Sequence, residues 1–306
     1  MLVNGVAIDD TFAEAFPMKA TRLIITAHDH TWARHAAVSM TGFATSVIAC
    51  GCEAGIECEL GVDATPDGRP GFSVLMFAVS GKELAKQVER RVGQCVLTCP
   101  TTAIFAGLDA GEPIALGRNL RFFGDGWQIA KKIGDQRFWR VPVMDGEFVC
   151  QETTPVVKAV GGGNLLLLAH DVDAALGAAA AAVAAMQQVR NVIMPFPGGV
   201  VRSGSKVGSK YPALPASTND AYCPALTALT AKTALTPDIR AVLEIVIDGL
   251  TENDVGAAMA AGMNAVTLRG VEAGIARISA GNYGGKLGPY HFHLHELTGS
   301  SAGASQ

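Results

Sequence analysis

The chain has 306 residues, of which 49% are apolar and 17% charged, and its formal net charge is −4 at pH 7. This length allows one large or two ordinary domains, and the slight negative charge argues against a general nucleic-acid-binding protein. Asp171 and Asp173 interrupt the long apolar run at residues 165–189, so we expect no membrane span there. The first ten residues lack the basic head of a signal peptide, and the seven cysteines are an odd number, so we expect a cytoplasmic protein with reduced thiols.

The predicted elements follow one order twice. In the first half we expect strands at residues 22–27, 44–50, 72–79 and 94–98, and helices at residues 30–40 and 81–92. In the second half we expect strands at residues 165–169, 191–194, 241–247 and 275–279, and helices at residues 172–188 and 251–264. Each half thus has the order β-α-β-β-α-β. This order predicts an α+β protein with an internal duplication of two ferredoxin-like lobes, residues 1–150 and 151–306.

Short motifs mark equivalent places in the two halves. A His-Asp pair follows the first strand of each half, at residues 28–29 and 170–171, and Asp29 or Thr31 can cap the first helix. The pentapeptide TPDGR at residues 65–69 is echoed by TPDIR at residues 236–240. Two further segments extend the lobes. Residues 121–149 predict a hairpin extension with turns at GDG and DG, and residues 290–297 (YHFHLHEL) predict an added strand.

The second half also carries an insertion, residues 192–224, which we call the inserted segment. It begins as a strand and continues as a long, irregular, glycine-rich stretch whose only charges before Asp220 are Arg202, Lys206 and Lys210. A long loop is usually functional or disordered, and the tyrosines and prolines in this one argue against disorder. Glycines let backbone N–H groups approach a ligand, and three cations favour an anionic ligand. The alternative is an exposed crossover loop with solvated lysines.

Glu244 is the strongest single candidate for a catalytic residue. It lies in AVLEIVIDGL, a predicted strand that is otherwise apolar on both faces, and Ser73 occupies the equivalent place in the first half. A carboxylate is seldom buried in such a strand without a partner or a task, and burial would raise its pKa. A protonated carboxyl can donate a hydrogen bond to a developing oxyanion or act as a general acid. The alternative is that Glu244 faces solvent or pairs with a basic residue.

Other candidate groups have weaker patterns. The C-x-C-x5-C spacing at residues 50–58 does not match a usual zinc site, so we expect buried or incidental thiols. Three alternating histidines at residues 291–295 could share one face of a strand, but acids in a suitable register are missing, so we predict no metal site. Cys223 could be a nucleophile, although no histidine is near it in sequence. The glycine-rich sequence GNYGGKLG at residues 281–288 fits neither a P-loop nor a dinucleotide fingerprint.

Several long segments together resemble the formylmethanofuran–tetrahydromethanopterin formyltransferase family. They are NGVAIDDTFAEAF (residues 4–16), TGFATSVI (41–48), TPDGRPG (65–71), FFGDGWQ (122–128), PFPGGVVRSGSKVGSK (195–210), LPASTNDAYCP (214–224), EIVIDGL (244–250), ISAGNYGGKLG (278–288) and FHLHEL (292–297). The resemblance covers nearly the whole chain, and it implies the same two-lobed duplication that the repeated order of elements predicts.

The resemblance implies direct transfer of a formyl group between the amine of methanofuran and nitrogen 5 of tetrahydromethanopterin. Both cofactors would be substrates, with no covalent acyl-enzyme and no metal. Glu244 matches the glutamate that is implicated in catalysis in the family. The acidic tails of both substrates could be held by Arg202, Lys206 and Lys210. As substrate-binding residues we predict Gly199, Arg202, Ser205, Lys206, Ser209, Lys210, Asn219, Asp220 and Tyr222.

The near-neutral charge and the long alanine runs resemble a bacterial member of this family. The resemblance then implies the formyltransferase subunit of a formyltransferase/hydrolase complex in methylotrophs, active in the oxidation of formaldehyde to formate. We therefore expect a homo-oligomer with hydrolase-complex subunits as partners, and no nucleic acid or membrane. Two alternatives stay open: a non-catalytic structural subunit of the same complex, or an unrelated ligand- or RNA-binding module of paired ferredoxin-like lobes. The predicted strands hold few of the aromatic residues that RNA-binding sheets expose.

Overall fold

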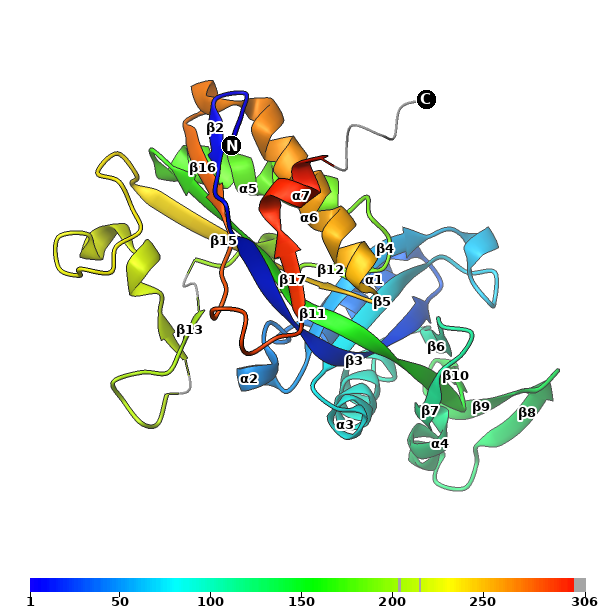
Figure 1. The fold of residues 1–306 in the computed structure, drawn as a ribbon. Coiled ribbons are helices and arrows are strands. Elements are labelled where there is room, and N and C mark those ends of the chain that lie inside the picture. The colour runs from blue at the N-terminus through cyan, green and yellow to red at the C-terminus, as the bar shows by residue number, and fades with distance from the viewer. Residues whose placement is uncertain (203–204, 215, 300–306) are drawn as a thin grey trace. The chain divides into compact units, whose positions relative to one another are not determined.

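A computed structural model describes residues 1–202, 205–214 and 216–299 of the chain. The chain folds into two compact units. We call residues 17–159 the middle unit, and residues 1–16 together with those from 160 onward the terminal unit. Each unit combines helices with a mixed sheet, which confirms the predicted α+β class (Figure 1). The predicted division into residues 1–150 and 151–306 stays a prediction about the two halves of the sequence. The compact units instead place the first 16 residues with the C-terminal part of the chain.

The middle unit contains part of β3 (Phe12–Thr26) and the start of β11 (Thr153–Ala169), together with the elements between them. These are α1 (His30–Thr41), α2 (Val47–Cys50), β4 (Glu53–Leu60), β5 (Gly71–Ala78), α3 (Gly81–Arg91), β6 (Ala103–Ala106), β7 (Glu112–Ala115), α4 (Gly117–Leu120), β8 (Ile129–Ile133), β9 (Gln136–Val143) and β10 (Gly146–Gln151). Its sheet has the order β4-β5-β3-β6-β10-β9-β8, in which only the β6–β10 pair is parallel.

The terminal unit contains the rest of β3 and β11. Its other strands and helices are β1 (Leu2–Val3), β2 (Val6–Ile8), α5 (Val172–Met186), β12 (Val192–Ile193), β13 (Ser205–Val207), β14 (Ala216–Thr218), β15 (Ala241–Gly249), α6 (Glu252–Arg269), β16 (Ile275–Ser279), β17 (Tyr290–His293) and α7 (Leu294–Gly299). Its main sheet has the order β2-β16-β11-β15-β12, and β17 pairs with the first residues of β3. Strands β13 and β14 form a separate hairpin within the inserted segment.

Small residues let the two long helices of the terminal unit pack closely together and against the sheet (Figure 1). Helix α5 is mostly alanine, and its buried Ala178, Ala179 and Ala182 lie in one hydrophobic core with residues of α6 and the sheet. A side chain at Gly262 of α6 would meet the Met186 side chain at 2.1 Å, so the absence of a Cβ there permits the contact. This rigid layer supports β15, the strand that carries Glu244.

Most predicted elements are confirmed within a few residues. Asp29 caps α1 by accepting a hydrogen bond from the backbone N–H of Trp32, and Asp171 caps α5 in the same way. The predicted hairpin extension is confirmed as β8, β9 and β10, with Asp145 and Gly146 at a turn between the last two. None of the helices in the described part of the chain has both the length and the apolar character that a membrane span requires.

Two predicted strands of the first half are wrong. Residues 44–50 form no strand, because Ser46 accepts a hydrogen bond from the backbone N–H of Ile48 and begins the short helix α2. The strand follows as β4, where apolar and polar residues alternate in EAGIECEL. Residues 94–98 instead lie in and just after a π-helical turn (Val92–Val96) that prolongs α3. Val92 and Val96 are both buried, and their spacing of four residues is helical rather than extended.

The predicted tail strand over residues 290–297 is correct only as far as His293. Helix α7 begins at Leu294, whose side chain is fully buried in the core of the terminal unit. The three histidines of the tail therefore do not share the face of one strand. His291 and His293 lie on β17, whereas His295 lies on α7, where its Nε2 is 2.9 Å from the backbone carbonyl oxygen of Ile8. Among the described residues, no three His, Cys, Asp or Glu side chains gather as a metal site would require.

Candidate active site

Glu244 lies in the middle of β15, and the inserted segment runs beside it. In the sheet, Glu244 is directly opposite Leu166 of β11. On its other side it exchanges two backbone hydrogen bonds with Val201: the Val201 N–H donates to the Glu244 carbonyl at 2.8 Å, and the Glu244 N–H donates to the Val201 carbonyl at 2.9 Å. This bridge fixes the start of the inserted segment against the strand that carries the acid.

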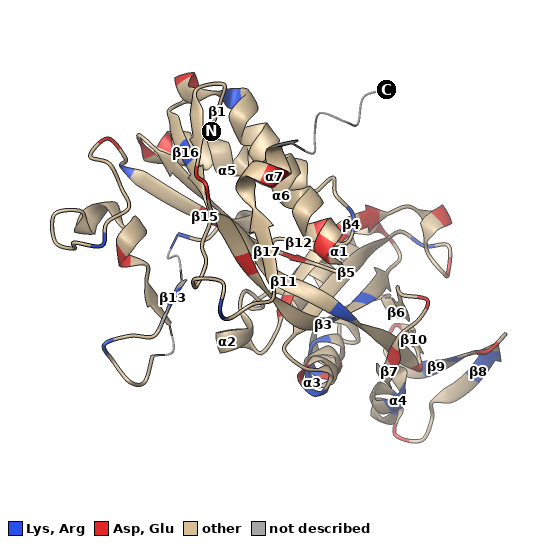
Figure 2. Cartoon of the chain, viewed as in Figure 1, with Lys and Arg blue, Asp and Glu red and all other residues tan. Residues whose placement is uncertain are grey.

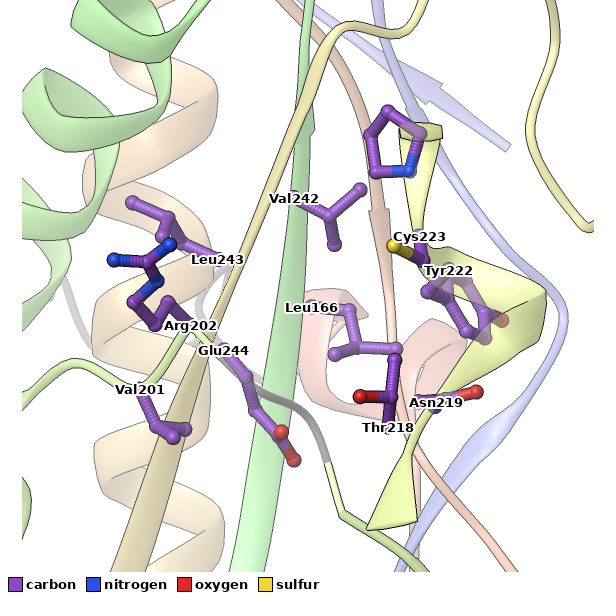
Figure 3. A pocket seen from close by; sticks show the side chains of 11 residues that line it. Leu166, Val201, Arg202, Thr218, Asn219, Tyr222, Cys223, Val242, Leu243 and Glu244 are labelled. Atoms are coloured by element: carbon purple, nitrogen blue, oxygen red, sulfur yellow. The ribbon is translucent and has the colours of Figure 1, made fainter. Parts of the chain in front are cut away.

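A cavity of about 300 Å³ opens between β15 and the inserted segment. Figure 3 shows Glu244 and Val201 on one side, Leu166 in between, and Thr218, Asn219, Tyr222 and Cys223 of the inserted segment on the other side. It is lined by Leu166, Val201, Arg202, Thr218, Asn219, Tyr222, Cys223, Pro224, Val242, Leu243 and Glu244. Aliphatic side chains from the sheet thus face amide, hydroxyl and thiol groups from the inserted segment.

The Glu244 carboxyl has no hydrogen-bond or ion-pair partner among the residues that the structure describes. Burial without a compensating charge raises its pKa from the ordinary value of 4.5 to about 7. Arg202, a cation that lines the same cavity, does not neutralise it, and in Figure 3 the Arg202 guanidinium and the Glu244 carboxyl extend in opposite directions. At neutral pH a substantial fraction of Glu244 is therefore protonated and able to donate a hydrogen bond into the cavity.

The far wall is built by a turn of the inserted segment that follows β14. The backbone N–H of Tyr222 donates to the Asn219 carbonyl, which closes the turn at 3.1 Å. The Tyr222 hydroxyl lies 3.3 Å from the Ser279 hydroxyl at the end of β16, and the Tyr222 ring packs on a small core that includes Leu166. The amide of Asn219 and the hydroxyl of Thr218 are presented from the same turn. These are the polar groups that a cavity needs to orient a heterocycle or an amide.

The cations of the inserted segment differ in their surroundings. Figure 2 shows Lys and Arg residues along the loop that carries β13. The sequence suggested that Lys206 has no acidic neighbour, but the structure pairs it with Asp220. The Lys206 Nζ lies 2.9 Å from a carboxylate oxygen of Asp220, which follows the β13–β14 hairpin. That hydrogen bond lowers the pKa of Asp220. Arg202 lines the cavity and has no ion-pair partner in the described ranges, and Lys210 is exposed and lies outside the cavity lining.

The structure brings some of the predicted site residues together and not others. Arg202, Asn219, Tyr222 and Glu244 line one cavity. The remaining predicted contacts, Gly199, Ser205, Lys206, Ser209, Lys210 and Asp220, do not line it. The hydroxyl of Ser209 accepts a hydrogen bond from the N–H of Tyr211, and the side chain of Ser205 lies outside the described part of the chain.

Gly199 has a structural reason to be glycine. Its φ is +79°, and a Cβ there would meet the Val183 side chain of α5 at 2.8 Å. The residue therefore seats the inserted segment on a helix rather than on the cavity. Thr218 and the aliphatic lining were not predicted from the sequence, because a single threonine and apolar positions carry no distinctive chemical signal. Cys223 was predicted only as a candidate nucleophile, and within the described cavity lining no histidine accompanies that thiol.

A cavity that pairs an unpartnered, protonatable carboxyl with amide and hydroxyl groups is suited to an enzyme that stabilises charge on a reacting carbonyl oxygen. Comparison with known protein families also indicates an enzyme that acts on a carbonyl group. Residues 1–143 match the family model described as formylmethanofuran–tetrahydromethanopterin formyltransferase, and residues 146–297 match the model of the proximal lobe of that enzyme. The chain belongs to the formylmethanofuran–tetrahydromethanopterin formyltransferase family.

Individual relatives match over nearly the whole chain. A protein of Methylococcus capsulatus named formylmethanofuran–tetrahydromethanopterin formyltransferase is 66% identical over 97% of this chain and 99% of its own length. One component of the formyltransferase/hydrolase complex of Methylorubrum extorquens is 50% identical over 96% of both chains. The crystal structure of that complex with methylofuran contains a chain similar to this one at a TM-score of 0.95, with 50% identity over 97% of this chain and 98% of that one. The formyltransferase of Methanosarcina barkeri matches at a TM-score of 0.91, with 46% identity over 97% and 100% of the two chains.

Proposed function

We propose that this chain is an enzyme that transfers a formyl group between nitrogen 5 of tetrahydromethanopterin and the amine of methanofuran or a methanofuran analogue. The names of the relatives support this activity. Because the similarity covers 97% of this chain, we assign the complete activity of the relatives to it. The observation that carries the proposal is the Glu244 carboxyl, which is unpartnered among the described residues and opens into the cavity of the inserted segment.

The proposed reaction needs a hydrogen-bond donor at the formyl oxygen. The acceptor amine attacks the formyl carbon, a new C–N bond forms, and negative charge develops on the formyl oxygen. Protonated Glu244 donates a hydrogen bond to that oxygen and stabilises the charge. The tetrahedral species then loses the donor nitrogen, which takes up the proton that the attacking amine releases. Holding both substrates in one site contributes by replacing a bimolecular encounter with an oriented contact.

We assign the substrate contacts of the cavity to Arg202, Asn219 and Tyr222. Arg202 suits an acidic group because a guanidinium can hold a carboxylate or phosphate with two hydrogen bonds. Asn219 and Tyr222 offer an amide and a hydroxyl to the polar part of a heterocycle. Contacts to the other predicted residues, Gly199, Ser205, Lys206, Ser209, Lys210 and Asp220, remain predictions.

We propose also that the two halves of the sequence are copies of one ferredoxin-like lobe. In the middle unit the strands that occur in the order β3, β4, β5, β6 lie in the sheet as β6-β3-β5-β4. In the terminal unit β11, β12, β15, β16 lie as β16-β11-β15-β12, which is the same permutation. The aspartate caps of α1 and α5, and the TPDGR and TPDIR motifs before β5 and β15, support the same conclusion.

We propose that the chain works in a cytoplasmic oligomer with hydrolase-complex subunits, in the oxidation of formaldehyde to formate. Its support is the similarity to the matching component of the Methylorubrum extorquens complex, whose structure contains methylofuran. In that setting the chain would receive the formyl group from tetrahydromethanopterin, and another protein of the complex would hydrolyse the product.

The test is a formyl-transfer assay with purified protein and both cofactors. We expect wild-type turnover, and Glu244→Ala is expected to lower kcat by about 100- to 1,000-fold, the usual loss for one donor to an oxyanion. Glu272→Ala is the matched control, because Glu272 is an exposed carboxylate in the same unit. Wild-type activity with an unaffected Glu244→Ala variant would remove Glu244 from the mechanism. A folded wild type that transfers no formyl group would favour a structural subunit instead.

A further inference from the structure

A second buried carboxylate of the terminal unit lies outside the cavity lining. It is Glu14, on β3, whose side chain is 1% exposed. One of its oxygens accepts hydrogen bonds from the backbone N–H groups of Tyr283 and Gly285, at 2.7 and 2.9 Å. The other accepts from those of Leu287 and Gly288, both at 2.6 Å. Burial by itself raises the pKa of Glu14, but these four donors outweigh it and lower the pKa to about 2, so the group is ionised.

All four donors belong to residues 281–288, the glycine-rich sequence GNYGGKLG, which we call the glycine loop. Gly284 and Gly285 have φ of +75° and +69°, a left-handed backbone conformation that glycine adopts without strain and that lets the loop turn around the carboxylate. Asn164 of β11 holds the start of the loop by exchanging hydrogen bonds with the N–H and carbonyl groups of Gly281. These hydrogen bonds hold the backbone of the glycine loop around the Glu14 carboxylate.

The glycine loop leaves the sheet beside the cavity. Ser279, at the end of β16, and Glu244 on β15 are both paired with Leu166 of the intervening strand, so the three residues form one row across the sheet. Leu166 and Glu244 line the cavity, and Ser279 contacts the hydroxyl of Tyr222, which also lines it. The loop therefore begins two residues after this row, next to the cavity wall.

Tyr283 is the loop residue with a side chain suited to chemistry. It is partly buried, and its ring packs against Phe16 with 6.0 Å between ring centroids. Burial raises the pKa of its hydroxyl, and the negative charges of Glu244 and Glu14 raise it further. The hydroxyl therefore stays neutral at physiological pH and can donate a hydrogen bond.

We propose that Glu14 is a positioning residue for the formyl-transfer site: by binding four N–H groups of the glycine loop, it fixes the loop at the cavity wall, with Tyr283 as a hydrogen-bond donor. This inference rests on the function proposed above for the same cavity. It gives the glycine loop, which matches no nucleotide-binding motif, a role in shaping the site rather than in holding a phosphate.

The test is a double-mutant cycle of Glu14→Gln and Tyr283→Phe, with turnover measured per folded molecule. The glutamine keeps the size of the side chain, but its NH2 group cannot accept hydrogen bonds, so two of the four loop N–H groups lose their acceptor. We expect each single change to lower kcat by about tenfold to a hundredfold, as small misplacements in a site do. The double variant is expected to be no slower than the slower single variant, because both changes remove one contribution. Multiplied losses would overturn the proposal.

A second pair of variants covers the case in which Glu14→Gln does not fold. Gly284→Ala strains the glycine loop, and Gly134→Ala strains the turn between β8 and β9 of the middle unit. Both glycines have positive φ, and an added Cβ would meet nothing within 4 Å at either site. Similar losses of Tm are expected, but only Gly284→Ala is expected to lower kcat, by about fivefold or more. Equal activity of the two variants would overturn the proposal.

A spectroscopic readout separates this inference from the proposed function. The tyrosinate absorbance of wild type minus that of Tyr283→Phe reports the ionisation of Tyr283 without any substrate. We expect Gly284→Ala to lower the pKa of Tyr283 towards its ordinary value of 10.0, because the side chain becomes less buried while both carboxylates remain. This shift in a protein that transfers no formyl group would refute the function and keep the coupling of loop and tyrosine. An active wild type whose Tyr283 titration is unmoved in Gly284→Ala would refute the coupling alone.

Discussion

The terminal unit holds two glutamates of low exposure whose surroundings have opposite effects. Glu14 accepts four backbone hydrogen bonds, and its pKa falls to about 2. The Glu244 carboxyl accepts none from the described residues, and its pKa rises to about 7. Burial raises the pKa of both groups, so the difference comes from the donors. An ionised carboxylate organises backbone, whereas an unsatisfied carboxyl near its pKa is available for a reacting molecule.

The cations of the inserted segment repeat this contrast. Lys206 is paired with Asp220 at the exposed hairpin, whereas Arg202 reaches the cavity without an ion-pair partner in the described part of the chain. A charge that is already paired gains little from a ligand, because binding must first break or share the existing contact. The unpaired groups, Glu244 and Arg202, are therefore the ones that should govern catalysis and binding.

The largest expected effect is on the pH profile of turnover. Protonated Glu244 is the active form, so kcat of the wild type should fall about tenfold per pH unit above the pKa of about 7, roughly a hundredfold by pH 9. Glu244→Gln cannot ionise and keeps an N–H donor, so its lower activity should not change over this range. A profile with the same alkaline limb in Glu244→Gln would assign that limb to another group and break the comparison.

Arg202→Ala should raise the KM of the more acidic substrate by about tenfold, because one charge-assisted hydrogen bond is typically worth that much. The defect should shrink as salt is added, since salt screens the attraction in the wild type as well. Lys131→Ala, at an exposed lysine of β8, is the control and should leave the KM unchanged. An equal effect of the two substitutions would show that only the net charge matters.

The stability of the two glutamine variants should change in opposite directions. Glu244 has a folded-state pKa above its ordinary value, so it favours folding only while protonated, and this contribution is lost as pH rises from 4.5 through about 7. At pH 8 Glu244→Gln should raise the free energy of unfolding by about 1–2 kcal/mol, a value discounted for partial exposure.

Glu14 has the reverse linkage. Its folded-state pKa is lowered, so its contribution is present above 4.5 and is lost as pH falls towards about 2. At pH 8 Glu14→Gln should lower the free energy of unfolding by about 1–3 kcal/mol, because backbone donors lose a charged acceptor. Urea unfolding at pH 8 measures both variants. Shifts of the same sign would refute the contrast between the two carboxyls.

The smallest effect is expected at Lys206 and Asp220. A double-mutant cycle with Lys206→Ala and Asp220→Ala should give only a small coupling in unfolding, decreasing with salt, as for other exposed ion pairs. Turnover of the single variants is the sharper measurement. A loss of kcat comparable to that of Glu244→Ala would place this pair in the catalytic site and contradict its assignment to the hairpin surface.

Elements were predicted most accurately from the sequence where one local signal decided the structure. The Asp29 cap and the helix after it were predicted correctly, because the capping contact lies within three residues of the aspartate. The predictions from the sequence failed where the spacing of apolar residues was compatible with both a helix and a strand. Residues 94–98 were predicted as a strand, although the buried Val92 and Val96 have helical spacing. The tail was predicted as one strand, although helix α7 begins at Leu294 and the Leu294 side chain is buried in the core.

By itself, the sequence determined that this is an α+β protein with a repeated order of elements, a glycine-rich cationic insertion and a glutamate out of place in an apolar strand. These features are local, so they can be predicted from the spacing of apolar residues, from helix caps and from turn residues. Only the tertiary structure decided which charges have partners. Lys206 meets Asp220 through a hairpin, and Glu14 meets a loop more than 260 residues away, at an |i−j| of 269 to 274. The protonation state of Glu244 depends on the same long-range packing, because its pKa reflects the donors and water that the folded chain leaves within reach.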